Sequence, residues 1–158
     1  MSGDQNHHGD KNKRSERYLR SESIRVLIVD DVSQVRAGLV DVLRLAAKRN
    51  KLKIEVIGEA QNGNEAIQIA RALHPDVILM DLEMPILDGY AATRQIKAEQ
   101  PATRVIILSI HAGLEAQQHA WEAGADGFVT KGAGYETMLS AILAINGPFE
   151  PTEIKSES

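Results

Sequence analysis

Cysteine is absent from this chain of 158 residues. Its absence excludes disulfide frameworks, thiolate metal sites and thiol nucleophiles, and it fits a reducing compartment. Long apolar runs are missing too. No stretch approaches the roughly 20 apolar residues that span a bilayer, and the first residues lack the apolar segment of a secretory signal. We therefore expect a cytoplasmic protein without a membrane partner.

An excess of basic residues is also missing. The 18 Lys and Arg residues stand against 22 Asp and Glu residues, for a net charge of −4. This balance argues against broad electrostatic attraction to nucleic acid. The content of 43% hydrophobic and 25% charged residues is that of an ordinary globular protein. Because the length suits one domain, we expect a single globular domain. Because its net charge is negative, we do not expect it to bind nucleic acid directly.

Polar segments flank the part of the chain that can fold. Residues 1–23 contain almost no apolar side chains, too few to offset the entropy lost on ordering them, and are predicted to be a flexible tail. The segment 147–158 is a second polar tail. The predicted folded domain therefore covers residues 24–146.

Short apolar runs alternate with segments of helical period in this domain. The runs predict strands at 26–29, 54–57, 77–80, 105–108 and 127–129. The intervening segments predict five helices. The first runs from an N-cap at Ser33 through Ala46, the second runs through Leu73, the third through Ile96, the fourth to Ala123, and the fifth covers residues from about 133 to 145. Strands that read as continuous apolar runs between helices indicate a doubly wound α/β fold with a parallel sheet.

Polar and charged side chains follow the predicted strands at their carboxyl ends, where open α/β sheets bind ligands. They are Asp30, Asp31, Asp81, Ser109 and Lys131. Two like charges about 4 Å apart repel by roughly 4 kcal/mol at an effective dielectric constant near 20, so three carboxylates require a counter-charge. The ammonium group of Lys131 supplies part of it. A hard divalent cation with oxygen ligands, such as Mg²⁺, would supply the rest.

Several motifs are similar to those of one family. They are Val29-Asp30-Asp31, the stretch from Asp76 to Pro85 with Asp88-Gly89, Leu108-Ser109, Ala123-Gly124-Ala125, and Phe128-Val129-Thr130-Lys131. Together they resemble the response-regulator receiver domain, of which CheY is a member. Among receivers they are most similar to those of LuxR/NarL-type regulators, and we expect no output domain in this chain. The resemblance implies a flavodoxin-like (βα)5 fold with strand order 2-1-3-4-5.

The resemblance also implies roles for the residues at the strand ends. Asp81 would be the phosphoacceptor for a histidine kinase or a histidine phosphotransfer protein. The carboxylates of Asp31 and Asp81 and the backbone carbonyl of Glu83 would bind Mg²⁺, with Asp30 acting through a bound water. Lys131 and Ser109 would contact the phosphoryl oxygens. A receiver of this kind is a signalling module in two-component transduction and catalyses only its own phosphotransfer and dephosphorylation.

Signal output is expected on the face formed by the fourth helix, fifth strand and fifth helix. There Phe128 matches an aromatic switch position, with core packing an equal alternative. Trp121 is either an interface anchor or, slightly favoured, a half-buried core residue. Phosphorylation would change this face for partner binding or homodimerisation. Glu83, Ile110 and His111 are expected to tune the lifetime of the phosphoryl group, with Ile110 narrowing the access of water.

Two alternatives use the same residues differently. A haloacid-dehalogenase-type phosphatase also has an aspartate nucleophile after a strand, but it needs a second Asp two residues later, where this chain has Glu83. A pseudo-receiver would act by binding alone, against which stands the complete set of Asp30, Asp31, Asp81, Ser109 and Lys131.

Overall fold

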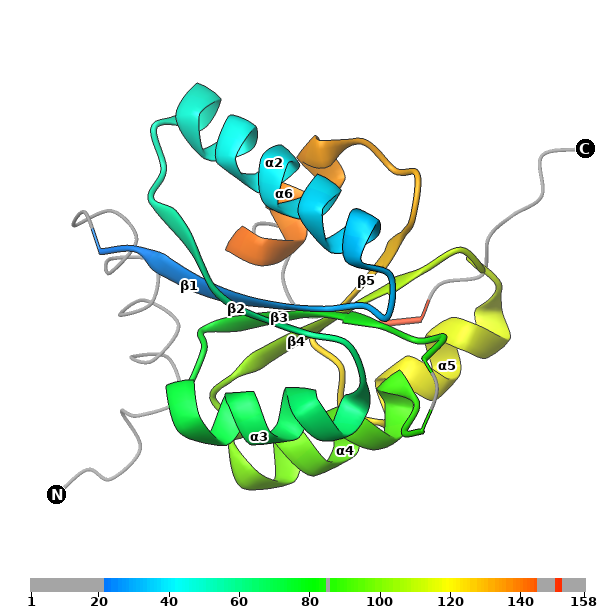
Figure 1. The fold of residues 1–158 in the computed structure, drawn as a ribbon. Coiled ribbons are helices and arrows are strands. Elements are labelled where there is room, and N and C mark those ends of the chain that lie inside the picture. Colours follow the sequence, from blue (N-terminus) through cyan, green and yellow to red (C-terminus); the bar gives the residue numbers. More distant parts are fainter. Residues whose placement is uncertain (1–21, 85, 145–149, 152–158) are drawn as a thin grey trace, which may run out of the picture.

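The computed structural model describes residues 22–84, 86–144 and 150–151. The predicted tails, 1–23 and 147–158, lie almost entirely outside these ranges. Strands and helices alternate along the chain (Figure 1), in the order β1 (Ile24–Val29), α2 (Ser33–Asn50), β2 (Ile54–Ala60), α3 (Gly63–Leu73), β3 (Val77–Asp81), α4 (Gly89–Glu99), β4 (Arg104–Ser109), α5 (Leu114–Glu122), β5 (Gly127–Thr130) and α6 (Tyr135–Leu143).

The strands form one parallel sheet in the order β2-β1-β3-β4-β5. Helices α2 and α6 cover one face of this sheet, and α3, α4 and α5 cover the other (Figure 1). The prediction of a doubly wound, flavodoxin-like α/β fold is therefore confirmed. The parallel arrangement places the carboxyl ends of all five strands at the same edge.

Two apolar cores lie on opposite faces of the sheet. Alternate residues of each central strand point to opposite sides, so Val26 and Ile28 face α2 and α6, whereas Leu27 and Val29 face the other three helices. Strands β1, β3 and β4 are buried almost throughout. This burial on both faces explains why their sequences read as continuous apolar runs.

The edge strand β2 is longer than predicted, because it continues through Gly58 to Ala60 instead of ending at Ile57. The register against β1 shifts here: Val26 pairs with Val56, but Leu27 pairs with Gly58, so Ile57 is an extra residue. Such a bulge interrupts the alternation on which the sequence prediction depended.

The start of α2 also differs from the prediction. Ser33 is the first helical residue and not the N-cap, which is Val32 in an extended conformation without a side-chain cap. The carboxylate of Asp30 accepts a hydrogen bond from the Val32 N–H at 2.9 Å and so takes part of that role. At the other end of the domain, α6 stops at Leu143 and Ala144 turns to a positive φ of 55°. The predicted last residue, 145, lies outside the described ranges.

None of the helices among the described residues is long and apolar enough to cross a membrane.

Candidate functional site

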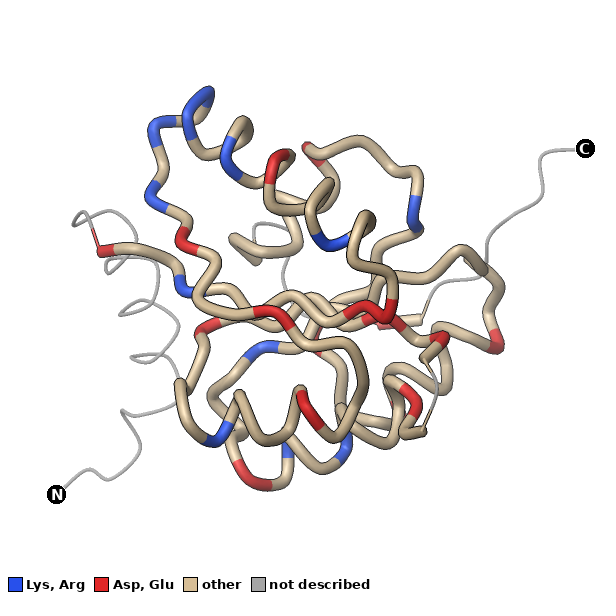
Figure 2. Tube along the Cα trace, viewed as in Figure 1, with Lys and Arg blue, Asp and Glu red and all other residues tan. Residues whose placement is uncertain are grey.

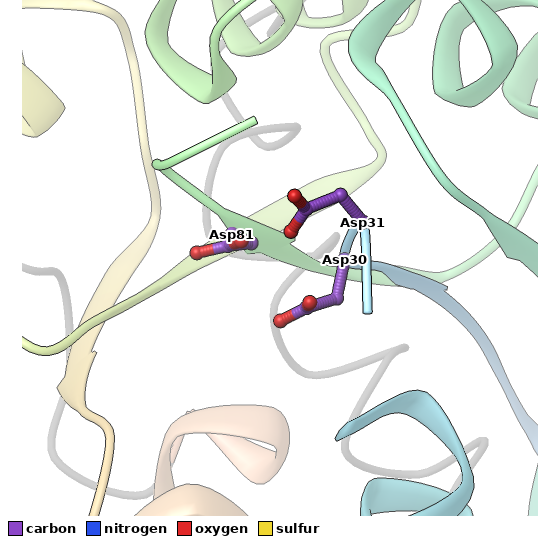
Figure 3. A group of neighbouring side chains, drawn as sticks. All are labelled: Asp30, Asp31 and Asp81. Carbon is purple, nitrogen blue, oxygen red and sulfur yellow. The ribbon is translucent and has the colours of Figure 1, made fainter. Parts of the chain in front are cut away.

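Three aspartates converge at the carboxyl edge of the sheet (Figure 3). Asp30 and Asp31 directly follow β1, and Asp81 is the last residue of the neighbouring strand β3, with Val29 paired to Met80. One carboxylate oxygen from each lies within 4.8 Å of the others, and Asp30 and Asp81 are buried while Asp31 is exposed. The sequence prediction that these side chains meet is therefore confirmed by the geometry.

Lys131 reaches this cluster from just beyond β5. Its Nζ lies 3.0 Å from Oδ2 of Asp30 and 2.9 Å from Oδ1 of Asp81. Burial lowers the pKa of Lys131, but the hydrogen bonds to Asp81 and Asp30 outweigh it, and the net pKa is raised. The lysine therefore stays charged and neutralises part of the acidic cluster, as the sequence predicted.

The surroundings of Asp81 disfavour the ionised form of its carboxyl group. Burial raises the pKa of its carboxyl group, the hydrogen bond from Lys131 lowers it, and the nearby charge of Asp30 raises it again, for a net increase. The ionised form of Asp81 is therefore disfavoured, mainly by burial, and the contact with Lys131 does not offset this fully. Figure 2 shows acidic residues gathered at this edge of the molecule. The donor set consists only of oxygens, which suits a hard cation such as Mg²⁺.

Ser109 ends the next strand, β4, and is almost completely buried. Its backbone carbonyl accepts a hydrogen bond from the Lys131 N–H at 2.7 Å, which ties β4 to the start of the β5–α6 loop. Its Oγ accepts a hydrogen bond from the His111 N–H at 3.0 Å. The hydroxyl group is therefore linked to the loop that leads into α5.

The three residues predicted to tune the site lie on exposed loops. Nε2 of His111 is 3.0 Å from Oε1 of Glu83, so these two side chains bridge the loops after β3 and β4. The Glu83 N–H also donates to Oδ1 of Asp81 at 3.3 Å. Ile110 exposes 59% of its surface beside Ser109.

Sequence reasoning assigned no role at the site to two residues that build it. Arg36 donates to the backbone carbonyl of Asp30 at 2.7 Å and to Glu59 on β2, which fixes the turn after β1. A cation in the first turn of a helix opposes the helix dipole, and that was the available signal. Gly89 packs so closely behind Asp81 that a Cβ atom would lie 2.2 Å from the Asp81 carbonyl oxygen.

The two predicted output residues differ in burial. Phe128 on β5 is half-buried and packs against the core beneath α3, α4 and α5. Trp121 on α5 exposes 50% of its surface and belongs to neither apolar core, so the favoured expectation is right about half-burial and wrong about a core position. The inward positions of α5 are instead Gln117 and Ala120.

Known proteins share this sequence pattern and this fold. Residues 26–143 match the family model of the response regulator receiver domain. Response regulator GacA of Pseudomonas aeruginosa is 40% identical over 119 residues, which cover 75% of this chain and 53% of GacA. The chain thus spans about half the length of the curated relatives it matches.

Solved structures of response regulators share the fold of this chain. A two-component response regulator of the LuxR family from Aurantimonas sp. SI85-9A1 superimposes with a TM-score of 0.70 and 36% identity, over 78% of this chain and 85% of that one. The chemotaxis protein CheY4 of Vibrio cholerae gives a TM-score of 0.67 and 25% identity, over 78% of this chain and 99% of that one.

Proposed function

The chain belongs to the family of response regulator receiver domains of two-component signalling, and on that premise we propose that it accepts a phosphoryl group on Asp81. The observation that carries the proposal is the position of the Asp81 carboxylate. It is buried at the end of β3, within reach of two further carboxylates and in direct contact with the ammonium group of Lys131. A carboxylate held near a cation site and a lysine is suited to receive a phosphoryl group.

Mg²⁺ fits the oxygen donors at this edge. The carboxylates of Asp31 and Asp81 and the backbone carbonyl of Glu83 would hold it, with Asp30 acting through a bound water. When bound, the cation screens the negative charges of donor and acceptor and stabilises the equatorial phosphoryl oxygens. Burial is the first cause of the raised pKa of Asp81 and the nearby charge of Asp30 adds to it, so a cation bound beside both carboxylates would favour their ionised forms.

In the transfer step, an oxygen of Asp81 forms a bond to the phosphorus of a phosphohistidine on the donor protein. The phosphorus–nitrogen bond breaks, and the imidazole nitrogen keeps the electron pair and takes up a proton. Lys131 then pairs with one phosphoryl oxygen, and the Ser109 hydroxyl group donates to another. Asp81 remains as an aspartyl-phosphate until water hydrolyses it.

The donor would be a histidine kinase or a histidine phosphotransfer protein. A groove of about 480 Å³ between α2 and α6 supports docking of such a protein beside the site. The groove runs from exposed apolar side chains of α2, such as Val42 and Leu45, to Lys131. An apolar helix face of the donor could cover these side chains.

Output would pass from Ser109 into the surface formed by α5, β5 and α6. Donation from the Ser109 hydroxyl group to the phosphoryl group would reorient this side chain, whose Oγ accepts from the His111 N–H, and would pull the following loop inward. Phe128 would then turn toward the space that Ser109 vacates. Half-exposed Trp121 would change its surroundings and serve partner binding or homodimerisation.

The experiment that tests the proposal follows the intact mass of the protein. Purified protein is incubated with acetyl phosphate or phosphoramidate, with and without Mg²⁺. We expect one phosphoryl adduct that requires Mg²⁺, is lost in Asp81→Asn, and persists in Asp41→Asn, which changes an exposed carboxylate on α2. Folded wild-type protein without an adduct would contradict the proposal and favour a pseudo-receiver that acts by binding alone.

A further inference from the structure

Helix α5 is weakly anchored to the rest of the domain. Of its nine residues only Gln117 and Ala120 are buried, and its N-cap, Gly113, provides no side-chain hydrogen bond. Leu114 and Trp121, seven residues apart and therefore on the same side of the helix, expose 41% and 50% of their surfaces. A helix with so little buried surface is held by few contacts, and each of them matters for its position.

Tyr90, at the start of α4, provides one of these contacts. Its hydroxyl group donates to the backbone carbonyl of Ala116 on α5 at 3.2 Å. Its ring meets the ring of His119 edge to face, with centroids 5.7 Å apart and an interplanar angle of 88°. Burial, followed by the charges of Asp88 and Glu115, raises the pKa of Tyr90. The phenol therefore stays protonated and acts as a hydrogen-bond donor at neutral pH.

The backbone next to Tyr90 is fixed to the phosphorylation site. Gly89 packs against the carbonyl group of Asp81, and its N–H donates to the Leu82 carbonyl at 3.4 Å. The Asp88 side chain caps the same helix end by accepting from the Ala91 N–H at 2.8 Å. Tyr90 thus links a rigid support behind Asp81 to α5. Helices α4 and α5 lie on the lower face of the sheet in Figure 1.

Helix α5 is connected to the site in a second way, through the chain itself. Residues 110–113 join Ser109 to α5. In this structure the Ser109 hydroxyl group accepts from the His111 N–H, and Lys131 pairs directly with Asp81. Because residues 110–113 lead directly into α5, a movement of this segment toward a phosphoryl group would pull on α5 and act against its contact with Tyr90.

We propose that Tyr90 is a positioning residue that holds α5 in its unphosphorylated arrangement, so that phosphorylation of Asp81 works against the hydrogen bond to Ala116. The inference rests on the proposed phosphoacceptor function of Asp81. A neutral hydrogen bond shifts an equilibrium between two conformations by about two- to tenfold. By thermodynamic linkage, removal of this bond must increase the affinity of the site for a phosphoryl group by the same factor.

The test compares wild type with Tyr90→Phe, which removes the hydroxyl group and keeps the ring. Beryllofluoride, a stable substitute for the phosphoryl group, is titrated at saturating Mg²⁺. Binding is followed through the fluorescence of Trp121, the one tryptophan of the chain, which lies on α5. We expect the apparent dissociation constant of Tyr90→Phe to be about two- to tenfold lower than that of wild type.

Two further variants separate this role from a general loss of stability. Tyr135→Phe removes a hydroxyl group from a half-buried tyrosine on α6, across the sheet from α5, and should leave the affinity unchanged. His119→Ala removes the ring contact alone and should increase the affinity to a smaller extent. Urea unfolding of each variant shows that it is folded under the conditions of the titration.

An unchanged or weaker affinity in folded Tyr90→Phe would overturn the assignment, because the hydrogen bond would then not oppose the phosphorylated arrangement. Failure of the underlying function has a different signature. In that case wild-type protein would neither bind beryllofluoride nor gain a mass adduct from acetyl phosphate.

Discussion

Ile86, near the site, has an unfavourable backbone conformation. It lies in the loop between β3 and α4, has a φ of 75°, and exposes 79% of its surface. A β-branched side chain is rarely found at positive φ, because its Cβ atom approaches the following carbonyl oxygen. This backbone conformation costs about 1–3 kcal/mol, and the exposed side chain recovers little of it by burial.

Ile86→Gly should therefore stabilise the protein by about 1 kcal/mol, the relief of strain being partly offset by the greater freedom of glycine in the unfolded chain. Urea unfolding followed by Trp121 fluorescence measures the effect. Val32→Gly is a matched control, because Val32 is also β-branched and exposed but has a φ of −101°. It should give no gain. Equal effects of both substitutions would show that Ile86 is not strained.

Ile110 is expected to prolong the phosphorylated state. It directly follows Ser109 and is large and exposed, so it can restrict the approach of water to a phosphoryl group on Asp81. Ile110→Ala should shorten the half-life of the adduct severalfold after the phosphodonor is removed, as followed by intact mass. Leu114→Ala changes another exposed aliphatic residue, on α5, and should leave the half-life unchanged. An unchanged half-life in Ile110→Ala would contradict the expectation.

At the scale of elements, two helices contain glycines with opposite requirements. Gly89 begins α4, where a Cβ atom would lie 2.2 Å from the Asp81 carbonyl oxygen and 3.0 Å from the Leu82 Cα atom. These are backbone atoms that cannot rotate away. Gly38 lies within α2, and a Cβ atom there would meet nothing within 4 Å. The start of α4 can therefore be placed against Asp81 only with glycine, whereas α2 has no such need.

Gly89→Ala should destabilise the protein by about 2 kcal/mol or more, because α4 must move away from Asp81. Gly38→Ala should stabilise it by about 0.5–1 kcal/mol, since alanine restricts the unfolded chain and favours a helix. The free energy of unfolding in urea measures both. A neutral Gly89→Ala would mean that α4 is not held against the site, and would also weaken the link assigned to Tyr90.

At the scale of the whole molecule, the acidic site lowers the stability of the metal-free protein. Folding raises the pKa of Asp81, so the ionised carboxylate is less favourable in the folded than in the unfolded state. This cost is present above the folded pKa. It decreases as the pH falls below that value, because the folded protein then binds the proton, and it is gone below the pKa of the unfolded state.

Asp81→Asn should consequently be more stable than wild type at neutral pH in the presence of a chelator. The difference should shrink as the pH is lowered toward the ordinary pKa of aspartate, about 3.9. Mg²⁺ should reverse the order, because binding to the folded wild type adds about 2.7 kcal/mol at one hundred times the dissociation constant. Thermal unfolding of both proteins across this pH range, with chelator or Mg²⁺, measures the effect. A less stable Asp81→Asn in chelator would show that pairing with Lys131 outweighs burial.

The sequence by itself determined the fold class and the composition of the site. Strands β1, β3 and β4 are buried on both faces, so their apolar runs were visible without coordinates. In a parallel sheet all carboxyl ends meet at one edge, so residues that follow the strands must converge. That rule places Asp30, Asp81 and Lys131 at one edge, but their meeting also depends on the strand order, which the sequence indicated only through the family resemblance.

Only the tertiary structure decided how the elements are tied together. The hydroxyl group of Tyr90 on the Ala116 carbonyl and the buried guanidinium group of Arg104 on the last carbonyls of α6 join elements that are distant in the sequence. The exposure of Trp121 depends on how α5 is rotated against the sheet. Sequence periodicity describes one element at a time, and its signal does not contain the relative placement of two side chains from different elements. These contacts arise when the helices pack, and they fix which parts of the surface can respond to the site.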